Sequence, residues 1–255
     1  MKGVVLAGGL GTRLYPLTKI TNKHLLPVYN RPMIHWPLLA LVEAGVQDIM
    51  IVTGGSFAGA FLQLLGNGRE FGLRDIHYTY QEGEGGIAEA LSLAEHFVDG
   101  DRVVVILGDN IFEHSIRPYA DAFAAQKSGA RIVLSEVPDP QRFGVPAFDA
   151  NKRITNIIEK PTQPPSNYAV AGIYMYDEYV WEVIRTLKPS DRGELEITDV
   201  NNAYLRRGDL EYSVMKGWWT DAGTFDSLLS ASHKVHDREA KEPFAKFLRT
   251  EHRDG

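Results

Sequence analysis

The chain has 255 residues, 44% of them hydrophobic, which is enough for one large α/β domain with a sizeable core. Its net charge of −6 argues against nucleic-acid binding, because no general positive field is present. The absence of cysteine excludes disulfides, thiolate metal sites and a cysteine nucleophile, and no apolar run reaches the length of a signal-peptide core or a membrane span, so we expect a cytoplasmic protein.

Five apolar, β-branched runs in the first part of the chain predict strands. They are Val4–Ala7, Ile49–Thr53, Ile76–Gln81, Val103–Leu107 and Arg131–Val137. Continuous apolar runs, as opposed to alternating ones, are typical of parallel strands that are buried on both faces. Helix-like segments separate the strands, and the first, Pro32–Ala44, is expected to kink or break at Pro37.

Beyond Val137 the predicted strands are joined by shorter turns. Strands are expected at Phe143–Phe148, Ile154–Glu159 and Val170–Tyr176, and helices near Tyr179–Leu187 and Ile197–Arg206. We interpret these strands as additions to the same sheet. The highly charged tail from about His233 predicts a helix followed by a frayed end. No internal repeat or linker interrupts the chain, so one compact domain is expected.

A glycine-rich turn follows the first strand in "VVLAGGLGTRLYPLTKITNKHLLPV", residues 4 to 28. It fails the dinucleotide fingerprint, whose last glycine is replaced by Leu14, and it lacks the Gly-Lys-Ser/Thr end of a P-loop. Backbone N–H groups in such a turn can still bind phosphate, and Arg13 and Lys23 could add two cations. An ordinary turn beside a solvated lysine is the alternative.

Two aspartates follow apolar runs from distant parts of the sequence. Asp109 ends "VVVILGDN", at the carboxyl end of a predicted strand, where open α/β sheets bind ligands. Asp221 lies in "WWTDAGT". A turn-forming aspartate and a helix N-cap are the respective alternatives. Together, two such carboxylates suit the oxygen preference of Mg²⁺.

The glycine-rich stretch resembles the signature G-G-x-G-T-R-L-x-P-x-T and K-x-x-L-P of the sugar-nucleotide pyrophosphorylases, a nucleotidyltransferase family, and within it the bacterial glucose-1-phosphate thymidylyltransferases. Similar motifs continue along the chain: "LGDNIF", "RFGV", "EKP", "SNYAVAGIYMYD", "RGELEITD" and "WWTDAGT". The resemblance implies a Rossmann-like nucleotidyltransferase domain with a mixed, mostly parallel central sheet flanked by helices. It would span residues 1–235, with a nucleotide-binding part at about 1–112, a sugar-phosphate-binding part at about 113–235, and a charged tail at 236–255.

The resemblance also implies the reaction. Glucose 1-phosphate would attack the α-phosphorus of dTTP in line, forming dTDP-glucose and pyrophosphate with the aid of Mg²⁺, in a pathway to deoxysugars such as dTDP-rhamnose. No general base is needed, because a phosphate monoester is already ionised at neutral pH. Catalysis would then consist of positioning and electrostatic stabilisation. The expected assembly is a homotetramer.

The resemblance implies a role for each site residue. Asp109 and Asp221 would bind the metal, Arg13 and Lys23 the triphosphate and the leaving pyrophosphate, and Lys160 the sugar phosphate, so that the catalytic set is Arg13, Lys23, Asp109 and Lys160. The nucleotide would contact Leu6, Gly8, Gly9, Gly11, Thr12, Arg13, Lys23, Gln81 and Gly86. The sugar phosphate would contact Asn110, Gly144, Glu159, Lys160, Val170 and Tyr174. The amide of Gln81 could match O4 and N3–H of thymine or uracil.

The chain departs from the family pattern at two places. His24 stands where members often have glutamine, and "QEGEGGIAEA" replaces "QPSPDGLAQA", which leaves the choice between dTTP and UTP open. Longer members continue into a helical C-terminal segment of a regulatory site, so feedback control by that route is not expected here. A UTP-dependent pyrophosphorylase and a non-catalytic sugar-nucleotide sensor remain alternatives, whereas Leu14 argues against a dinucleotide-dependent oxidoreductase.

Overall fold

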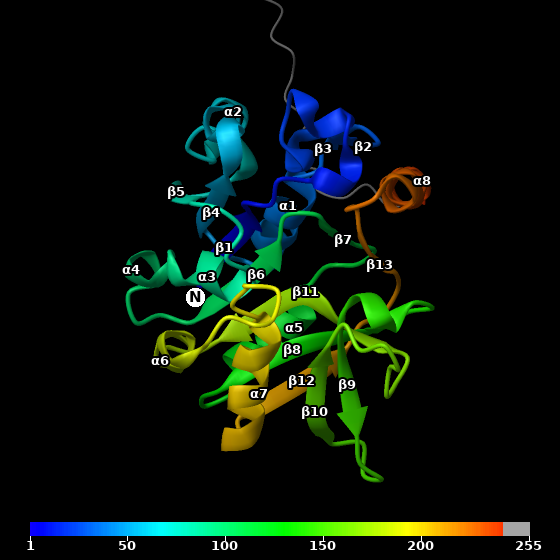
Figure 1. Cartoon of the computed structure of the whole chain (residues 1–255). Coiled ribbons are helices and arrows are strands. Elements are labelled where there is room, and N and C mark those ends of the chain that lie inside the picture. Colours follow the sequence, from blue (N-terminus) through cyan, green and yellow to red (C-terminus); the bar gives the residue numbers. More distant parts are fainter. Residues whose placement is uncertain (242–255) are drawn as a thin grey trace, which may run out of the picture.

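In the computed structural model, which describes residues 1–241, a seven-stranded sheet forms the centre of the molecule (Figure 1). The strand order is β12-β8-β11-β6-β1-β4-β5. Strands β1, β4, β5 and β6 are parallel, β12 is parallel to β8, and β11 runs antiparallel to both β6 and β8. This confirms the predicted mixed, mostly parallel sheet. Its strands are β1 (Lys2–Ala7), β4 (Asp48–Gly54), β5 (Asp75–Gln81), β6 (Val103–Leu107), β8 (Ala130–Glu136), β11 (Tyr168–Tyr176) and β12 (Leu210–Val214).

Helices cover both faces of the sheet, which explains why the inner strands β1, β4 and β6 are continuously apolar, whereas the edge strands β5 and β12 are more polar. Along β1, Val5 and Ala7 belong to one hydrophobic core and Val4 and Leu6 to the other, and all four side chains are buried. On the Val5 side lie α1 (His35–Glu43), α2 (Ala58–Leu65), α5 (Arg117–Ala124) and α8 (Phe225–Lys241). On the Val4 side lie α3 (Ile87–Ser92), α4 (Glu95–Val98), α6 (Tyr179–Thr186) and α7 (Ile197–Arg207).

Helix α1 begins three residues later than predicted and does not break at Pro37. Arg31–Pro32 forms strand β3, which pairs with β2 (Pro27–Val28), and the helix starts at His35. Pro37 is therefore the third residue of the helix. The N–H groups of the first turn have no partner within a helix, so proline costs no hydrogen bond there.

The expectation that all later strands join the central sheet is wrong for two of them. Strands β9 (Gly144–Phe148) and β10 (Ile154–Glu159) form a separate antiparallel ribbon, in which Gly144 pairs with Glu159. A second short ribbon, β7 (Asn110–Phe112) with β13 (Trp219–Asp221), joins segments about a hundred residues apart and places Asp221 opposite Asn110. The prediction missed β7, β12 and β13, since runs this short or this polar carry little periodic signal.

The last described element, α8, starts at Phe225 and therefore well before His233, and it lies beside β2 (Figure 1). The Ser232 hydroxyl accepts a hydrogen bond from Tyr29 N at 3.2 Å across this contact. The expected tail boundary at 236 falls inside this helix, and residues 242–255 lie outside the described part. Within residues 1–241 no helix is both long and apolar enough to cross a membrane. The described residues also form six 3₁₀ turns: Thr12–Leu14, Leu17–Lys19, Lys23–Leu25, Gly55–Phe57, Arg69–Phe71 and Pro140–Arg142.

Candidate active site

Two adjoining cavities lie at the carboxyl ends of β1, β5 and β6. The Gln81 cavity, of about 270 Å³, is lined by the glycine-rich turn, Lys23, Gln81 and the start of α3. The Asp221 cavity, of about 240 Å³, lies between β6, β11, the β9–β10 ribbon and α7. Asp109 lines both. Because β11 is antiparallel to β6, the first residues of β11 lie at the same end of the sheet as the last residues of β6.

Most of the predicted site residues line one or the other of the two cavities. Leu6, Gly8, Gly9, Lys23, Gln81 and Gly86 line the Gln81 cavity. Asn110, Gly144, Glu159, Lys160, Val170 and Tyr174 line the Asp221 cavity, together with both aspartates. Arg13 also lines the Asp221 cavity, whereas Gly11 and Thr12 form the turn before it and line neither cavity.

The glycine-rich turn folds back so that Lys23 reaches the end of β6. Gly11 has φ of 69°, and a β-carbon on it would lie 2.8 Å from that of Lys23, so only glycine fits both the conformation and the space. The Thr18 hydroxyl donates to Gly11 O at 3.0 Å, and Asn22 caps the turn that carries Lys23. These contacts bring Lys23 to Asp109, which is distant from it in the sequence.

Asp109 is held from two sides at the junction of the cavities. Lys23 Nζ lies 2.6 Å from its Oδ2, and the Asn110 amide donates to its Oδ1 at 2.8 Å. Its buried position would raise the pKa of this carboxyl, but the Lys23 ammonium and these two hydrogen bonds hold it well below its ordinary value. Asp109 is therefore a fixed, ionised carboxylate.

The Asp221 carboxylate converges on the same small space as Asp109. A β-carbon built on Gly223 would lie 3.5 Å from Asp109 Oδ2, 3.6 Å from Asp221 Oδ2 and 3.2 Å from Arg13 Nη2. Burial and the negative charge of Asp109 raise the pKa of Asp221 above its ordinary value, and Arg142, whose Nη2 donates to Asp221 Oδ2 at 3.0 Å, opposes this. The two carboxylates therefore bring like charges close together, and neither compensates the negative charge of the other.

This arrangement fits a hard divalent cation. Two carboxylate oxygens face one space kept open by Gly223, and oxygen donors are what Mg²⁺ prefers. Within residues 1–241 no group of three or more His, Cys, Asp or Glu side chains could hold a metal. A cation at this place would therefore take its remaining ligands from phosphate oxygens and water.

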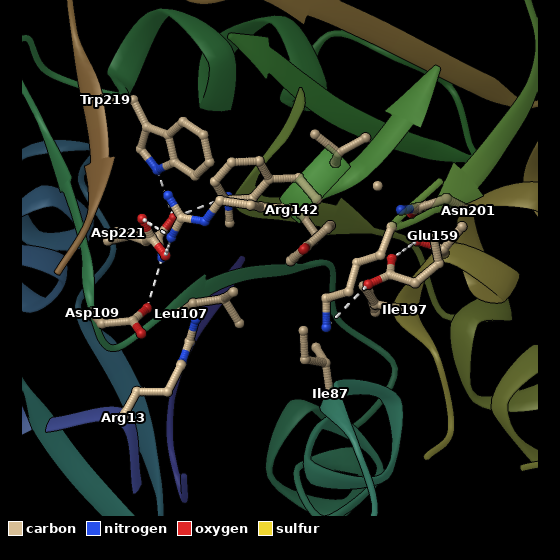
Figure 2. A pocket seen from close by; sticks show the side chains of 18 residues that line it. Arg13, Ile87, Leu107, Asp109, Arg142, Glu159, Ile197, Asn201, Trp219 and Asp221 are labelled. Carbon is tan, nitrogen blue, oxygen red and sulfur yellow. Dashed lines mark hydrogen bonds and ion pairs between the residues drawn. The ribbon is translucent and has the colours of Figure 1, made fainter. Parts of the chain in front are cut away.

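The guanidinium of Arg13 has no hydrogen bond or ion pair with any residue in the range 1–241. In the described part of the chain it makes no ion pair, whereas Lys23, Arg142 and Lys160 each have a carboxylate partner. Figure 2 shows Arg13, Asp109 and Asp221 on one side of the Asp221 cavity and Glu159 and Asn201 on the other. An unpaired, forked cation beside two carboxylates is suited to bind phosphate oxygens.

The opposite wall combines an acid, a cation and hydrogen-bonding groups. Glu159 Oε2 accepts a hydrogen bond from the Thr198 hydroxyl at 2.6 Å, and its Oε1 lies 3.7 Å from Lys160 Nζ and 3.5 Å from Arg192 Nη2. Lys160 has φ of 43°, an unusual value for a residue with a side chain, and its N–H donates to Phe143 O at 2.9 Å. The ribbon thereby fixes the direction of this lysine.

His24 is a buried, neutral residue under the Gln81 cavity. Burial and the Lys23 charge lower its pKa to about 3, so the ring carries no charge at neutral pH. Its Nδ1 and its backbone N–H lie 2.7 and 2.9 Å from Asn22 Oδ1. A β-carbon on Gly108 would come within 2.8 Å of its ring, so His24 packs against the residue before Asp109.

Sequence reasoning assigned no role to several residues that shape the site. Arg142 lies in the recognised "RFGV" motif and pairs with Asp221, and Thr198 in "RGELEITD" hydrogen-bonds Glu159. Trp219 Nε1 donates to Asn110 Oδ1 at 2.6 Å. Asn201 lines the Asp221 cavity, and its Oδ1 accepts from Tyr176 at 2.6 Å, while its Nδ2 is buried with no hydrogen-bond partner among the described residues. Arg142, Thr198 and Trp219 lie in the recognised motifs, but no pattern pointed to Asn201.

Replacing Asn110 with alanine is expected to lower kcat about tenfold and stability by about 1–3 kcal/mol. The Asn110 oxygen accepts from Trp219 Nε1 and from Gly172 N at 3.0 Å, which directs its amide nitrogen toward Asp109. Alanine leaves two buried donors unpaired and frees the Asp109 carboxylate. Denaturant unfolding and steady-state kinetics measure both effects, and wild-type values for both would contradict this role.

Several known proteins are similar to this chain. A family model described as nucleotidyl transferase matches residues 2–238. The glucose-1-phosphate thymidylyltransferase of Neisseria meningitidis is 45% identical over 238 residues, 92% of this chain and 82% of the relative. That of Mycobacterium tuberculosis is 43% identical over 244 residues, 95% of this chain and 84% of the relative.

Solved structures agree with these similarities. A candidate glucose-1-phosphate thymidylyltransferase of Bacillus anthracis, in complex with a sucrose, superposes with a TM-score of 0.89 at 55% identity, covering 93% of this chain and 96% of the other. A UDP-glucose pyrophosphorylase complexed with UDP-glucose has a TM-score of 0.80 at 24% identity, covering 93% of this chain and 98% of the other. The second likeness shows a shared fold.

Proposed function

The chain belongs to the nucleotidyl transferase family, and from this membership we propose that it joins dTTP and glucose 1-phosphate into dTDP-glucose, releasing pyrophosphate. The observation that carries the proposal is the pair of cavities that meet at Asp109. One has an amide suited to a nucleobase and Lys23, a cation suited to a triphosphate; the other has Arg13, Lys160 and polar groups suited to phosphate and sugar.

The residues present support positioning and charge stabilisation as the source of catalysis. Arg13 and Lys23 would bind the triphosphate of a nucleotide whose base lies near Gln81, and Lys160 would bind the phosphate of the sugar. The reacting phosphorus would then lie at the junction of the cavities, next to Asp109. Holding two polyanions in line in a site of fixed cations supplies positioning and charge stabilisation, and no general base is needed because the attacking phosphate monoester is already ionised.

We propose that Asp109 and Asp221 hold a Mg²⁺ ion. When bound, this ion would neutralise phosphate charge and polarise the oxygens of the α-phosphate. Lys23 and Asn110 fix the first carboxylate, and Arg142 orients the second. These partners keep both aspartates in place while the substrates enter and leave.

Glu159 is proposed to bind hydroxyl groups of the sugar. It is held by Thr198, lines the Asp221 cavity with Val170 and Tyr174, and lies across that cavity from the aspartates (Figure 2). Burial raises the pKa of Tyr174 far above its ordinary value, so its hydroxyl stays protonated and can donate.

The proposal divides the domain as the sequence suggests. Residues of about 1–112 would bind the nucleotide, and those of about 113–235 the sugar phosphate, with Asp109 and Asp221 linking the two parts. The family resemblance also leads us to propose a homotetramer located in the cytoplasm, which light scattering and cell fractionation would test.

The test of the proposed function is pyrophosphate release over a grid of nucleoside triphosphates and sugar 1-phosphates, with Mg²⁺. We expect the highest kcat/KM for dTTP with glucose 1-phosphate. A higher value for UTP would replace this proposal with a UDP-sugar pyrophosphorylase. No turnover for any pair would favour a non-catalytic sensor on the same fold.

A further inference from the structure

The amide of Gln81 is held in one orientation from behind by Glu89, and we propose that Glu89 thereby selects nucleobases that carry an imino N–H. Such bases include thymine and uracil, and cytosine lacks this group. Glu89 would be a positioning residue for base choice. The inference rests on the proposed function, because it requires that the Gln81 cavity bind the base of the substrate nucleotide.

The contacts of Gln81 define its orientation. The side chain is 6% exposed at the end of β5, and its Nε2 donates to the Glu89 carboxylate and to Gly86 O, the latter at 3.3 Å. An ionised carboxylate and a backbone carbonyl can only accept hydrogen bonds. The nitrogen end of the amide must therefore face Glu89 and Gly86, because the opposite orientation would place oxygen against oxygen.

The oxygen end of the amide is consequently turned the other way. A β-carbon on Gly8 would lie only 2.4 Å from Gln81 Oε1, so this oxygen faces the glycine-rich turn. Gly8 and Gln81 both line the Gln81 cavity, whereas Glu89 is not among the described residues that line it. Glu89 thus acts on a ligand through Gln81 and does not touch it.

Glu89 itself has a fixed position in the first turn of α3. Ala88 N donates to Leu195 O and Ala90 N to Gly86 O, both at 3.1 Å, which anchors the turn on either side of Glu89. A β-carbon on Gly85 would lie 2.7 Å from Glu89 Oε2, so a larger residue there would displace the carboxylate. Both positions differ from the family pattern "QPSPDGLAQA", which has aspartate in place of Gly85 and glutamine in place of Glu89.

This geometry offers the base an acceptor. Thymine and uracil have an N3–H that can donate to Gln81 Oε1, whereas N3 of cytosine is itself an acceptor and would oppose that oxygen. A site built to pair with a donor rejects an analogue without it, because its own polar group is left unpaired. Glutamine at position 89 would not impose this choice, since its amide can either accept from or donate to Gln81.

The test compares dUTP with dCTP. The two nucleotides have the same sugar and phosphates, but only dUTP has an N3–H on its base. Wild-type protein is expected to prefer dUTP in both Kd and kcat/KM. In Glu89→Gln this preference is expected to fall about tenfold. The main cause would be tighter binding and faster use of dCTP, because Gln81 can then turn its nitrogen toward the base. A preference within twofold of wild type would overturn the proposal.

Glu82→Gln is the matched control, since Glu82 is exposed, lies next to Gln81 and undergoes the same chemical change. It is expected to keep the wild-type preference, and a loss equal to that of Glu89→Gln would show that only the charge of the segment matters. Thermal unfolding of each variant checks that it is folded.

A double exchange, Gln81→Glu with Glu89→Gln, tests the orientation even if the single variant fails to fold. The new amide at position 89 can donate to the new carboxylate at 81, which still presents an acceptor to the base. The double variant is expected to prefer dUTP, although its overall affinity falls. Equal affinity for dCTP in this variant would overturn the proposal.

Nucleotide affinities measured by calorimetry separate this inference from the proposed function. Wild-type protein that binds dUTP over dCTP but makes no nucleotide sugar would refute the proposed reaction, and the variants would still test Glu89. Wild-type protein that does not discriminate between the two nucleotides would refute the role of Glu89, whatever reaction it catalyses.

Discussion

Asp109→Asn is expected to lower kcat at least ~10²-fold while leaving the fold intact. Asp109 lies at the junction of the two cavities, next to Asp221 and paired with Lys23 at 2.6 Å. The substitution keeps the shape and can still accept the hydrogen bond from Asn110, but it removes the charge that would bind Mg²⁺ and orient Lys23. The measurement is pyrophosphate release at saturating substrates.

A second readout links this effect to the metal. In Asp109→Asn the Mg²⁺ concentration for half-maximal activity should rise, because a neutral amide is a weaker ligand than a carboxylate. Asp121→Asn, at an exposed position of α5, is the control for the chemical change and should behave as wild type. Activity of Asp109→Asn within threefold of wild type would mean that this carboxylate is not a principal ligand.

Arg13→Ala is also expected to lower kcat by about 10²-fold, on the scale of a lost donor to a developing charge. Arg13 is the site cation without an ion pair among the described residues, and its Nη2 would lie 3.2 Å from a β-carbon on Gly223, in the space that the two aspartates face. Its loss would leave the triphosphate with Lys23, whose charge Asp109 already compensates.

Arg13→Lys distinguishes charge from geometry. An ammonium keeps the charge but cannot donate two parallel hydrogen bonds, so we expect a rate between those of Arg13→Ala and wild type. An unchanged rate for Arg13→Lys would show that charge alone suffices, and an unchanged rate for Arg13→Ala would remove Arg13 from the site. Arg69→Ala, at an exposed position of a 3₁₀ turn, is the control.

Much of the fold could be predicted, and the errors have physical causes. The inner strands β1, β4 and β6 are continuous apolar runs because both of their faces are buried, and this signal is local. Pro37 was misjudged because its effect depends on its place in the helix, which is set by the pairing of β2 with β3. The β9–β10 ribbon was assigned to the central sheet because apolar patterning predicts a strand but not its neighbour.

The site residues, like the strands, divide into those with a local sequence signal and those that depend on long-range contacts. Sequence patterns pointed to Asp109, Asp221 and Arg13, which follow apolar runs or lie in the glycine-rich turn, and the family resemblance added Lys160. They did not indicate that Asn110 would hold Asp109, that Arg142 would pair with Asp221, or that the Gln81 amide would be held by Glu89. A hydrogen bond between distant residues leaves no periodic trace in the sequence.

The sequence by itself determined the α/β class, the family, the main strands and the chemical types gathered at the site, since each of these depends on local patterns or on ordered motifs. Only the tertiary structure decided how those groups are combined. It placed Asp221 beside Asp109 through the pairing of β13 with β7, it left His24 buried and neutral under the Gln81 cavity, and it turned the oxygen of Gln81 toward Gly8. These features depend on which segments meet and on how much water they exclude, and both are properties of the folded chain.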